Sequence, residues 1–392
     1  MKRKKFSKEV WIVILIDLLK GIEFTGLILV PFFTDWGGVD QFQIQLLQSW
    51  FTLNVFLWEI PTGLFGDTKG LKYSVIMGHI LYIVGLIVYA SIPNIWVFAL
   101  GELILAVGTA FESGAKEAFL YETMKDNKEE EKYNDAVAFS GNMHLAAMII
   151  ASVIGGFLLP YMSLNHLFAI GVIPRIVALV LALIFLKEPS VERKKELVPD
   201  YKEIFKNAFR GLKRDKYLQK TAVFTTIMYG VSYFVLWFYQ PLLKNLGVLN
   251  EELCIYRIIL IVSEMLFLTV AVWAIGKFKK KRNIINIILV LLVAVGFFTA
   301  AFRNNISGVV VFIILSGGIG LNSREIFSKT LNDRIESKQR ATSLSAISML
   351  SRIFLAVSNI IFGYLSDINL NMTVGILGLI LLIGGLIFVP KD

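Results

Sequence analysis

Long apolar runs, separated by short polar or glycine-containing breaks, follow one another along the whole chain. A helix needs roughly 20 residues to cross the hydrocarbon core of a bilayer, because the core is about 30 Å thick and each residue rises about 1.5 Å. Twelve runs are of this kind: residues 9–33, 42–66, 73–91, 94–121, 134–159, 164–186, 218–242, 252–275, 284–302, 306–331, 340–365 and 371–389. Their apolar residues are continuous and do not alternate every second position, so we predict transmembrane helices and not a β-barrel.

The composition agrees with an integral membrane protein, since 56% of the 392 residues are hydrophobic and only 18% are charged. Lysines and an arginine precede the first run, as in a signal peptide. The run is too long for a signal peptide and has no small-residue cleavage site, so we predict a helix that is retained.

Basic residues are concentrated in alternate loops, for example Lys72 after the second run and Lys128 after the fourth. Such residues stay on the cytoplasmic side, so we predict that both termini are cytoplasmic. The net charge of +9 then needs no nucleic-acid partner, because anionic lipid headgroups attract the same loops. Short loops favour a multi-pass protein of a prokaryotic cytoplasmic (inner) membrane.

The longest polar stretch divides the twelve runs six and six. We predict an N-terminal six-helix bundle over residues 1–187, a cytoplasmic linker over 188–217 and a C-terminal six-helix bundle over 218–392. Apolar residues recur at helical spacing from Tyr201 to Leu212, which predicts a short amphipathic helix on the inner membrane surface. The two halves share a weak repeat, with "FESGAKEAFLYETMKD" in the fourth run and "LNSREIFSKTLND" in the tenth.

Several charged residues lie inside the apolar runs, where each costs roughly 2.5–3.5 kcal/mol unless it is paired or hydrated. In the fourth run, Glu102, Glu112 and Lys116 fall within an arc of about 80° around a helix. The first run carries a similar set, spread over an arc of about 120°: Asp17, Lys20 and Glu23. We therefore expect these faces to line a water-accessible cavity.

Two runs of the second half are also polar on one face. The tenth run contributes Asn322, Arg324 and Glu325, and the seventh contributes Tyr229, Tyr233 and Trp237. Two other interpretations stay open: a permanent pair of Glu112 with Lys116 across one helical turn, and core packing of the aromatic residues of the seventh run. For the isolated Arg175, pairing with another helix is favoured over substrate contact.

The loop between the second and third runs reads "GLFGDTKGLK" and resembles the signature of the major facilitator superfamily (MFS) in the same loop. Four residues match this signature: Gly63, Asp67, Gly70 and Lys72. The resemblance covers the whole chain and implies an all-α membrane fold of two pseudo-symmetric six-helix bundles. It further implies that helices one, four, seven and ten line the central cavity, and that Asp67 contacts the start of helix eleven near Arg340 as a gate.

This resemblance implies a transporter, and the chain has no phosphate-binding loop for nucleotide hydrolysis. We predict a secondary active transporter that works by alternating access and couples to protons. The candidate proton-coupling residues are Glu23, Glu112 and Asp17. The substrate-binding candidates are Lys20, Glu102, Lys116, Tyr229, Tyr233, Trp237, Asn322, Arg324 and Glu325.

For the small-molecule substrate, efflux of amphiphilic, drug-like compounds is preferred because the seventh run is aromatic, and proton-coupled uptake of a small metabolite or organic ion is the alternative. A different class is a membrane receptor or a lipid-acting enzyme, but no catalytic grouping supports an enzyme. The lone Cys254 and the three separate histidines predict no metal site, and we expect no cofactor.

Overall fold

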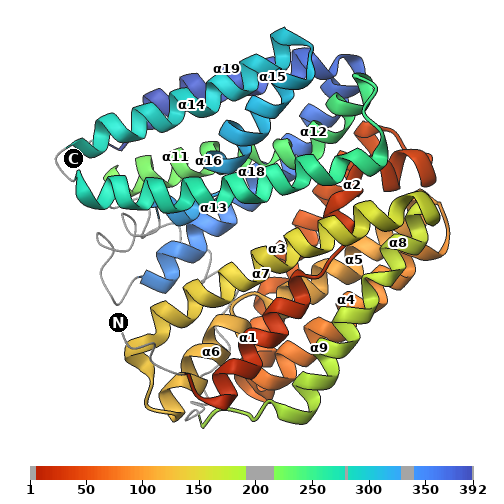
Figure 1. The fold of residues 1–392 in the computed structure, drawn as a ribbon. Helices are drawn as coiled ribbons and strands as arrows, with labels where there is room; N and C mark the ends of the chain where they lie inside the picture. Colours follow the sequence, from red (N-terminus) through yellow and green to blue (C-terminus); the bar gives the residue numbers. More distant parts are fainter. Residues whose placement is uncertain (1–5, 191–215, 279–280, 328–339, 391–392) are drawn as a thin grey trace. The chain divides into compact units, whose positions relative to one another are not determined.

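The computed structural model describes residues 6–190, 216–278, 281–327 and 340–390, without the side chains of residues 340–346. All regular elements in these ranges are helices (Figure 1). The chain forms two compact units. The division at Val198 lies among residues 191–215, outside the described part, as does the predicted amphipathic helix, so the linker stays a prediction.

The first unit comprises Met1–Ile28, Phe32–Val39 and Trp50–Val198. Its helices are α1 (Lys8–Gly21), the larger part of α3 (Gln41–Lys69), α4 (Leu71–Ser91), α5 (Ile95–Glu112), α6 (Ala115–Asp126), α7 (Tyr133–Leu158), α8 (Leu164–Ile170) and α9 (Val172–Phe185). Short helical turns complete it: η1 (Thr25–Leu27), η2 (Phe32–Trp36), η3 (Glu130–Lys132) and η4 (Leu159–Tyr161).

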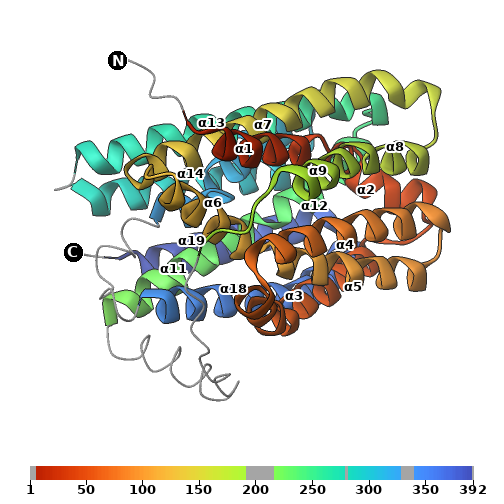
Figure 2. The same cartoon turned by 90° about the horizontal axis from the view of Figure 1, so that it is seen from below.

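Helix α1 packs between α7 and α9, and α4 packs along α5, as Figure 2 shows from below. The contact of α1 with α7 is close because Gly21 has no side chain: a Cβ atom there would meet the backbone oxygen of His144. In return, Nδ1 of His144 lies 3.0 Å from the backbone oxygen of Asp17. This contact fixes the polar end of α1 against α7.

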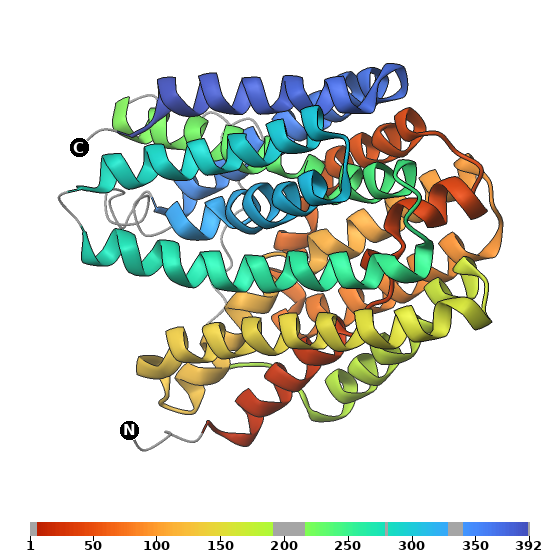
Figure 3. The same cartoon turned by 45° about the horizontal axis from the view of Figure 1, so that its top comes forward.

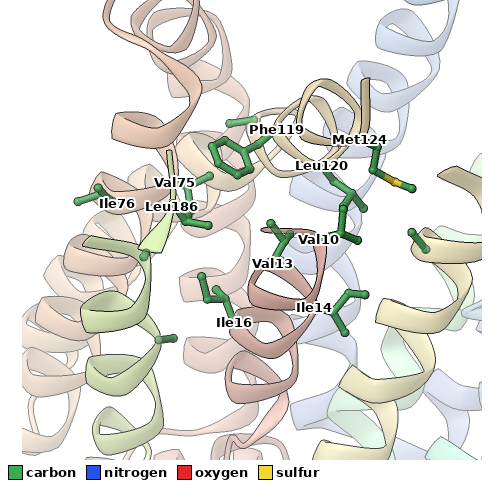
Figure 4. Packing of buried hydrophobic residues seen from close by; sticks show 14 residues of the cluster. Val10, Val13, Ile14, Ile16, Val75, Ile76, Phe119, Leu120, Met124 and Leu186 are labelled. Carbon is green, nitrogen blue, oxygen red and sulfur yellow. The ribbon is translucent and has the colours of Figure 1, made fainter. Parts of the chain in front are cut away.

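An apolar cluster joins five helices of the first unit (Figure 4). Val13 and Ile16 of α1 lie with Val75 of α4, Phe119 of α6 and Leu186, which follows α9. All five side chains are at most 9% exposed. The same five side chains line a small cavity together with charged residues of α1, α5 and α6, so the cluster forms an apolar wall next to these charges.

The second unit comprises Leu29–Pro31, Asp40–Ser49 and Pro199–Asp392. Its elements are α2 (Leu29–Pro31), the start of α3, α11 (Lys216–Ser232), α12 (Phe234–Asn245), η5 (Asn250–Glu252), α13 (Leu253–Lys277), α14 (Arg282–Arg303), α15 (Ile306–Val311), η7 (Phe312–Gly317), α16 (Gly318–Gly320), α18 (Arg340–Ile368) and α19 (Leu370–Phe388). Helix α14 packs along α19, which is dark blue in Figure 3.

The start of α3 belongs to the second unit through polar contacts. The hydroxyl of Ser49 donates to the backbone oxygen of Ala356 at 2.6 Å. The backbone N–H of Phe42 donates to Asp367 at 3.2 Å. Helix α3 therefore contributes to both units.

Ten helical stretches of the described residues are long and apolar enough to cross a membrane. The predicted runs 9–33 and 42–66 are not among them, although both are largely helical. The first is interrupted after Gly21, and the second is rich in glutamine, threonine and asparagine. The other ten predicted runs coincide with the ten stretches where the structure describes them.

Candidate functional site

The fourth predicted run breaks in the middle of its charged segment. Helix α5 ends at Glu112 and α6 begins at Ala115. Between them, Gly114 has φ +78°, in the left-handed region that favours glycine. The continuous helix predicted over 94–121 is therefore wrong here, and so is the pairing of Glu112 with Lys116 across one turn.

Glu112 instead meets residues from three other helices. Its carboxylate forms an ion pair with Lys20 of α1. Nη1 of Arg175 on α9 lies 3.5 Å from the second carboxylate oxygen. Nδ1 of His79 on α4 lies 3.9 Å from that same oxygen. The expected pairing of Arg175 with another helix is thus confirmed.

Asp17 holds the second pair of the site. Nζ of Lys116 lies 2.6 Å from Oδ1 of Asp17, and the hydroxyl of Ser140 on α7 donates to Oδ2 at 2.6 Å. The Lys116 side chain is 41% exposed, whereas that of Asp17 is 3% exposed. Lys116 is consequently the residue through which the site is exposed at the protein surface.

We name these five residues the buried ion cluster: Asp17, Lys20, Glu112, Lys116 and Arg175. All belong to the first unit, and the side chains other than Lys116 are at most 16% exposed. A cavity of about 20 Å³, room for about one water molecule, lies among four of them, His79 and the apolar wall.

Two groups of the site have unused hydrogen-bonding capacity. His79 is completely buried, and neither ring nitrogen has a hydrogen-bond partner among the described residues. Arg175 places its guanidinium 3.7 Å from the ring centre of Tyr82, and its Nε has no partner within the described ranges. Sequence reasoning proposed neither residue for the site, and the isolated charge in an apolar run was the available signal for Arg175.

The other two acids predicted in the first half form no ion pair with the cluster among the described residues. Glu23 follows the end of α1 and is partly exposed. Glu102 is buried on α5, about 15 Å along the helix from Glu112. The structure therefore brings together Asp17, Lys20, Glu112 and Lys116, and it leaves these two outside.

The candidates of the second half form a separate group in the second unit. The guanidinium of Arg324 lies 3.9 Å from the ring centre of Tyr229. Asn322 donates to the backbone oxygens of Glu264 and Gly318, both at 2.9 Å. Glu325 is exposed by surface area.

The aromatic candidates on the seventh run are engaged within the second unit. The Tyr233 hydroxyl donates to Gln48 at 3.3 Å. Trp237 is 5% exposed, and its backbone oxygen accepts from Gln41 at 3.2 Å. These contacts agree with the packing interpretation of both side chains.

The predicted gating loop has a cap that sequence reasoning missed. Gly70 has φ +123° and precedes α4. The backbone N–H groups of Leu71 and Lys72 donate to the two carboxylate oxygens of Glu188 at 2.8 and 2.9 Å. Lys72 also donates from Nζ to the backbone oxygen of Leu183 at 3.3 Å. Glu188 thus satisfies free donors at the start of α4.

Gly63 and Asp67 lie on the exposed end of α3. The predicted partner of Asp67, the segment from Arg340, has side chains outside the described part, so this gate stays a prediction. No group of three or more His, Cys, Asp or Glu residues in the described ranges is placed to hold a metal ion.

Known proteins similar to this chain are transporters. An uncharacterized transporter, BU466, of Buchnera aphidicola subsp. Acyrthosiphon pisum (strain APS) is 24% identical over 169 residues, which are 43% of this chain and 42% of that relative. The chain therefore matches less than half of the relative's length.

Two solved structures share the fold over nearly the full length. The nucleoside transporter NupG has a TM-score of 0.78 at 14% identity, covering 97% of this chain and 98% of that one. A D-xylose-proton symporter has a TM-score of 0.73 at 13% identity, covering 97% and 96%. The family model of the Major Facilitator Superfamily matches residues 21–353. The chain therefore belongs to the Major Facilitator Superfamily and is a multi-pass membrane protein.

Proposed function

We propose that the protein is a proton-coupled transporter that works by alternating access, with Glu112 as the principal proton-coupling residue. The observation that carries the proposal is the sharing of the Glu112 carboxylate between Lys20 and Arg175 inside the first unit. Nearby cations favour the ionised carboxylate, whereas burial opposes it. A change in the distance to these cations, or in the burial of Glu112, therefore changes whether Glu112 holds a proton.

A proton on Glu112 would free two cations from their counter-ion. Two conformations that surround these cations differently would then bind the proton with different affinity, which is the condition for coupling. Asp17 is the second candidate because it forms the other ion pair of the cluster. Glu23 remains a candidate from the sequence.

For the substrate, we propose uptake of a small metabolite or organic ion. The preference for efflux of amphiphilic compounds depended on free aromatic side chains in the seventh run. Tyr229 is covered by Arg324, and Tyr233 donates to Gln48, so these side chains give efflux no support. One structural neighbour is named a proton symporter, which favours the same proposal. We place the protein in a prokaryotic inner membrane, with both termini cytoplasmic.

The test is solute-driven proton movement in proteoliposomes that contain the full chain and an internal pH dye. Uridine, D-xylose and succinate are added outside in turn, and uptake is repeated with an inside-alkaline gradient. We expect one solute to acidify the lumen, and Glu112→Gln to abolish this signal. Glu117→Gln is the matched control, because Glu117 is exposed on α6 and lies outside the cluster.

Retention of gradient-driven uptake in Glu112→Gln, Asp17→Asn and Glu23→Gln alike would refute the proposed coupling. Solute uptake by the wild type that ignores the pH gradient would refute it as well.

A further inference from the structure

We propose that the substrate carries an anionic group, a carboxylate or a phosphate, that binds the cations of the buried ion cluster and makes Glu112 take up a proton. This inference rests on the proposed proton coupling and extends it to the substrate class. It also specifies symport of the anion with a proton.

The first argument is the charge balance of the cluster. Two carboxylates, Asp17 and Glu112, face three cations, Lys20, Lys116 and Arg175. The nearest further acids in sequence are Glu117, which follows Lys116 and is exposed, and Glu23, which is partly exposed; neither makes an ion pair with the cluster among the described residues. A buried site with one surplus positive charge is stabilised by an anion.

The second argument is the incomplete bonding of Arg175. A guanidinium has five N–H donors in a planar fork that matches a carboxylate or a phosphate. Here Nη1 makes a long contact of 3.5 Å with Glu112, and Nε has no partner within the described ranges. One face of the group lies on Tyr82. Nε of the fork is thus available in a residue that is 5% exposed.

The third argument is access. Lys116 is 41% exposed at the edge of the cluster, and the salt bridge that it forms is with Asp17 and not with Glu112. Its long side chain follows the break at Gly114, and rotation about its own bonds would uncover Asp17 and Lys20 behind it. An anion that arrives at this edge meets Lys116 first and then the deeper cations.

The fourth argument concerns the proton. The charged and titratable groups around Glu112 are Asp17 and Lys20 of α1, His79 and Tyr82 of α4, Lys116 of α6 and Arg175 of α9. An anion that binds Lys20 and Arg175 removes the two ion-pair partners of Glu112. The carboxylate, left in a buried site, then accepts a proton from water, and no bond to the substrate forms. By linkage, the proton and the anion strengthen each other's binding.

The test is titration calorimetry of the purified full chain in detergent with succinate, inorganic phosphate and uridine monophosphate. Uridine is the matched neutral probe. Runs in two buffers of different ionisation enthalpy give the number of protons taken up. We expect an anionic probe to bind with uptake of about one proton, and uridine to show no such uptake.

Variants assign the roles. We expect Arg175→Gln and Lys20→Gln to weaken anion binding roughly tenfold or more. Lys125→Gln, at a position on α6 that is 58% exposed, should bind as the wild type does. Glu112→Gln should bind the anion without proton uptake, and Glu117→Gln, at an exposed position of α6, should keep the uptake. Thermal unfolding of each variant verifies that it is folded.

The inference is overturned if no anionic probe binds the wild type, or if Arg175→Gln and Lys20→Gln bind as the wild type does. Proton uptake that persists in Glu112→Gln overturns the role of Glu112. Proton-coupled uptake of uridine or D-xylose without anion binding would refute the anionic substrate and leave the proposed coupling intact. Anion-linked proton uptake in a protein whose transport ignores the pH gradient would refute the proposed coupling instead.

Discussion

Single residues of the buried ion cluster contribute unequally because they differ in burial and in the number of partners. Glu112 is the ion-pair partner of two buried cations, Lys20 and Arg175. Asp17 pairs with the partly exposed Lys116 and also accepts a hydrogen bond from Ser140. Removing either acid therefore leaves a different set of charges without a counter-ion.

We predict that Glu112→Leu lowers the free energy of unfolding by about 3–5 kcal/mol, because two cations stay buried without a counter-ion. Asp17→Asn should cost about 1 kcal/mol or less: Lys116 reaches water, and the new amide oxygen still accepts from Ser140. Thermal unfolding of the two purified variants in the same detergent compares them. Equal losses in melting temperature would mean that the burial of the paired cations does not determine how much stability each variant loses.

At the scale of elements, the charged segments follow helix breaks in both units. Helix α5 ends two residues before α6, and α16 ends at Gly320 just before Asn322 and Arg324. Each unit also places a guanidinium on a tyrosine ring, Arg175 on Tyr82 and Arg324 on Tyr229. The two stacks join different helices of the two units, so the weak sequence repeat stays a prediction.

The break after α5 depends on Gly114. We predict that Gly114→Ala costs about 1–2 kcal/mol, because a side chain is strained at φ +78°. No atom lies within 4 Å of the added Cβ, so backbone strain alone causes the loss. Gly141 in α7 is the control, since its Cβ also meets nothing within 4 Å; Gly141→Ala should be neutral or stabilise by about 0.5–1 kcal/mol. Chemical unfolding of both variants gives the comparison, and an unchanged Gly114→Ala would contradict the strained break.

For the whole molecule, the apolar runs were sufficient to predict most of the helices, because lipid imposes a minimum length on every span. The family resemblance came from the loop motif that contains Gly63, Asp67, Gly70 and Lys72. The break at Gly114 was not predictable, because a glycine alone does not end a helix: Gly141 lies inside the continuous helix α7. The partners of Arg175, and the capping of α4 by Glu188, depend on which helices pack against one another. The spacing of apolar residues along the sequence does not contain that information. Lys116 pairs with Asp17 and not with Glu112, and its role in substrate binding stays a prediction.

The orientation in the membrane is the remaining property of the whole molecule that the sequence predicts. Alternate basic loops place the segment around Lys128 in the cytoplasm and the segment around Leu249 on the opposite side. Leu249 is 58% exposed, and Lys128 is exposed in the turn after α6. Both positions are therefore accessible to a thiol reagent once they carry a cysteine.

Because Cys254 is the single cysteine of the chain, a Cys254→Ser background gives an unlabelled reference. In intact cells, we expect a membrane-impermeant maleimide to label Leu249→Cys in this background. Lys128→Cys should be labelled only after the membrane is opened, since the bilayer separates it from the reagent. A mass shift on a gel reports each reaction. The reverse pattern would invert the orientation, and it would mean that the basic loops face away from the cytoplasm, against the charge asymmetry that orients membrane helices.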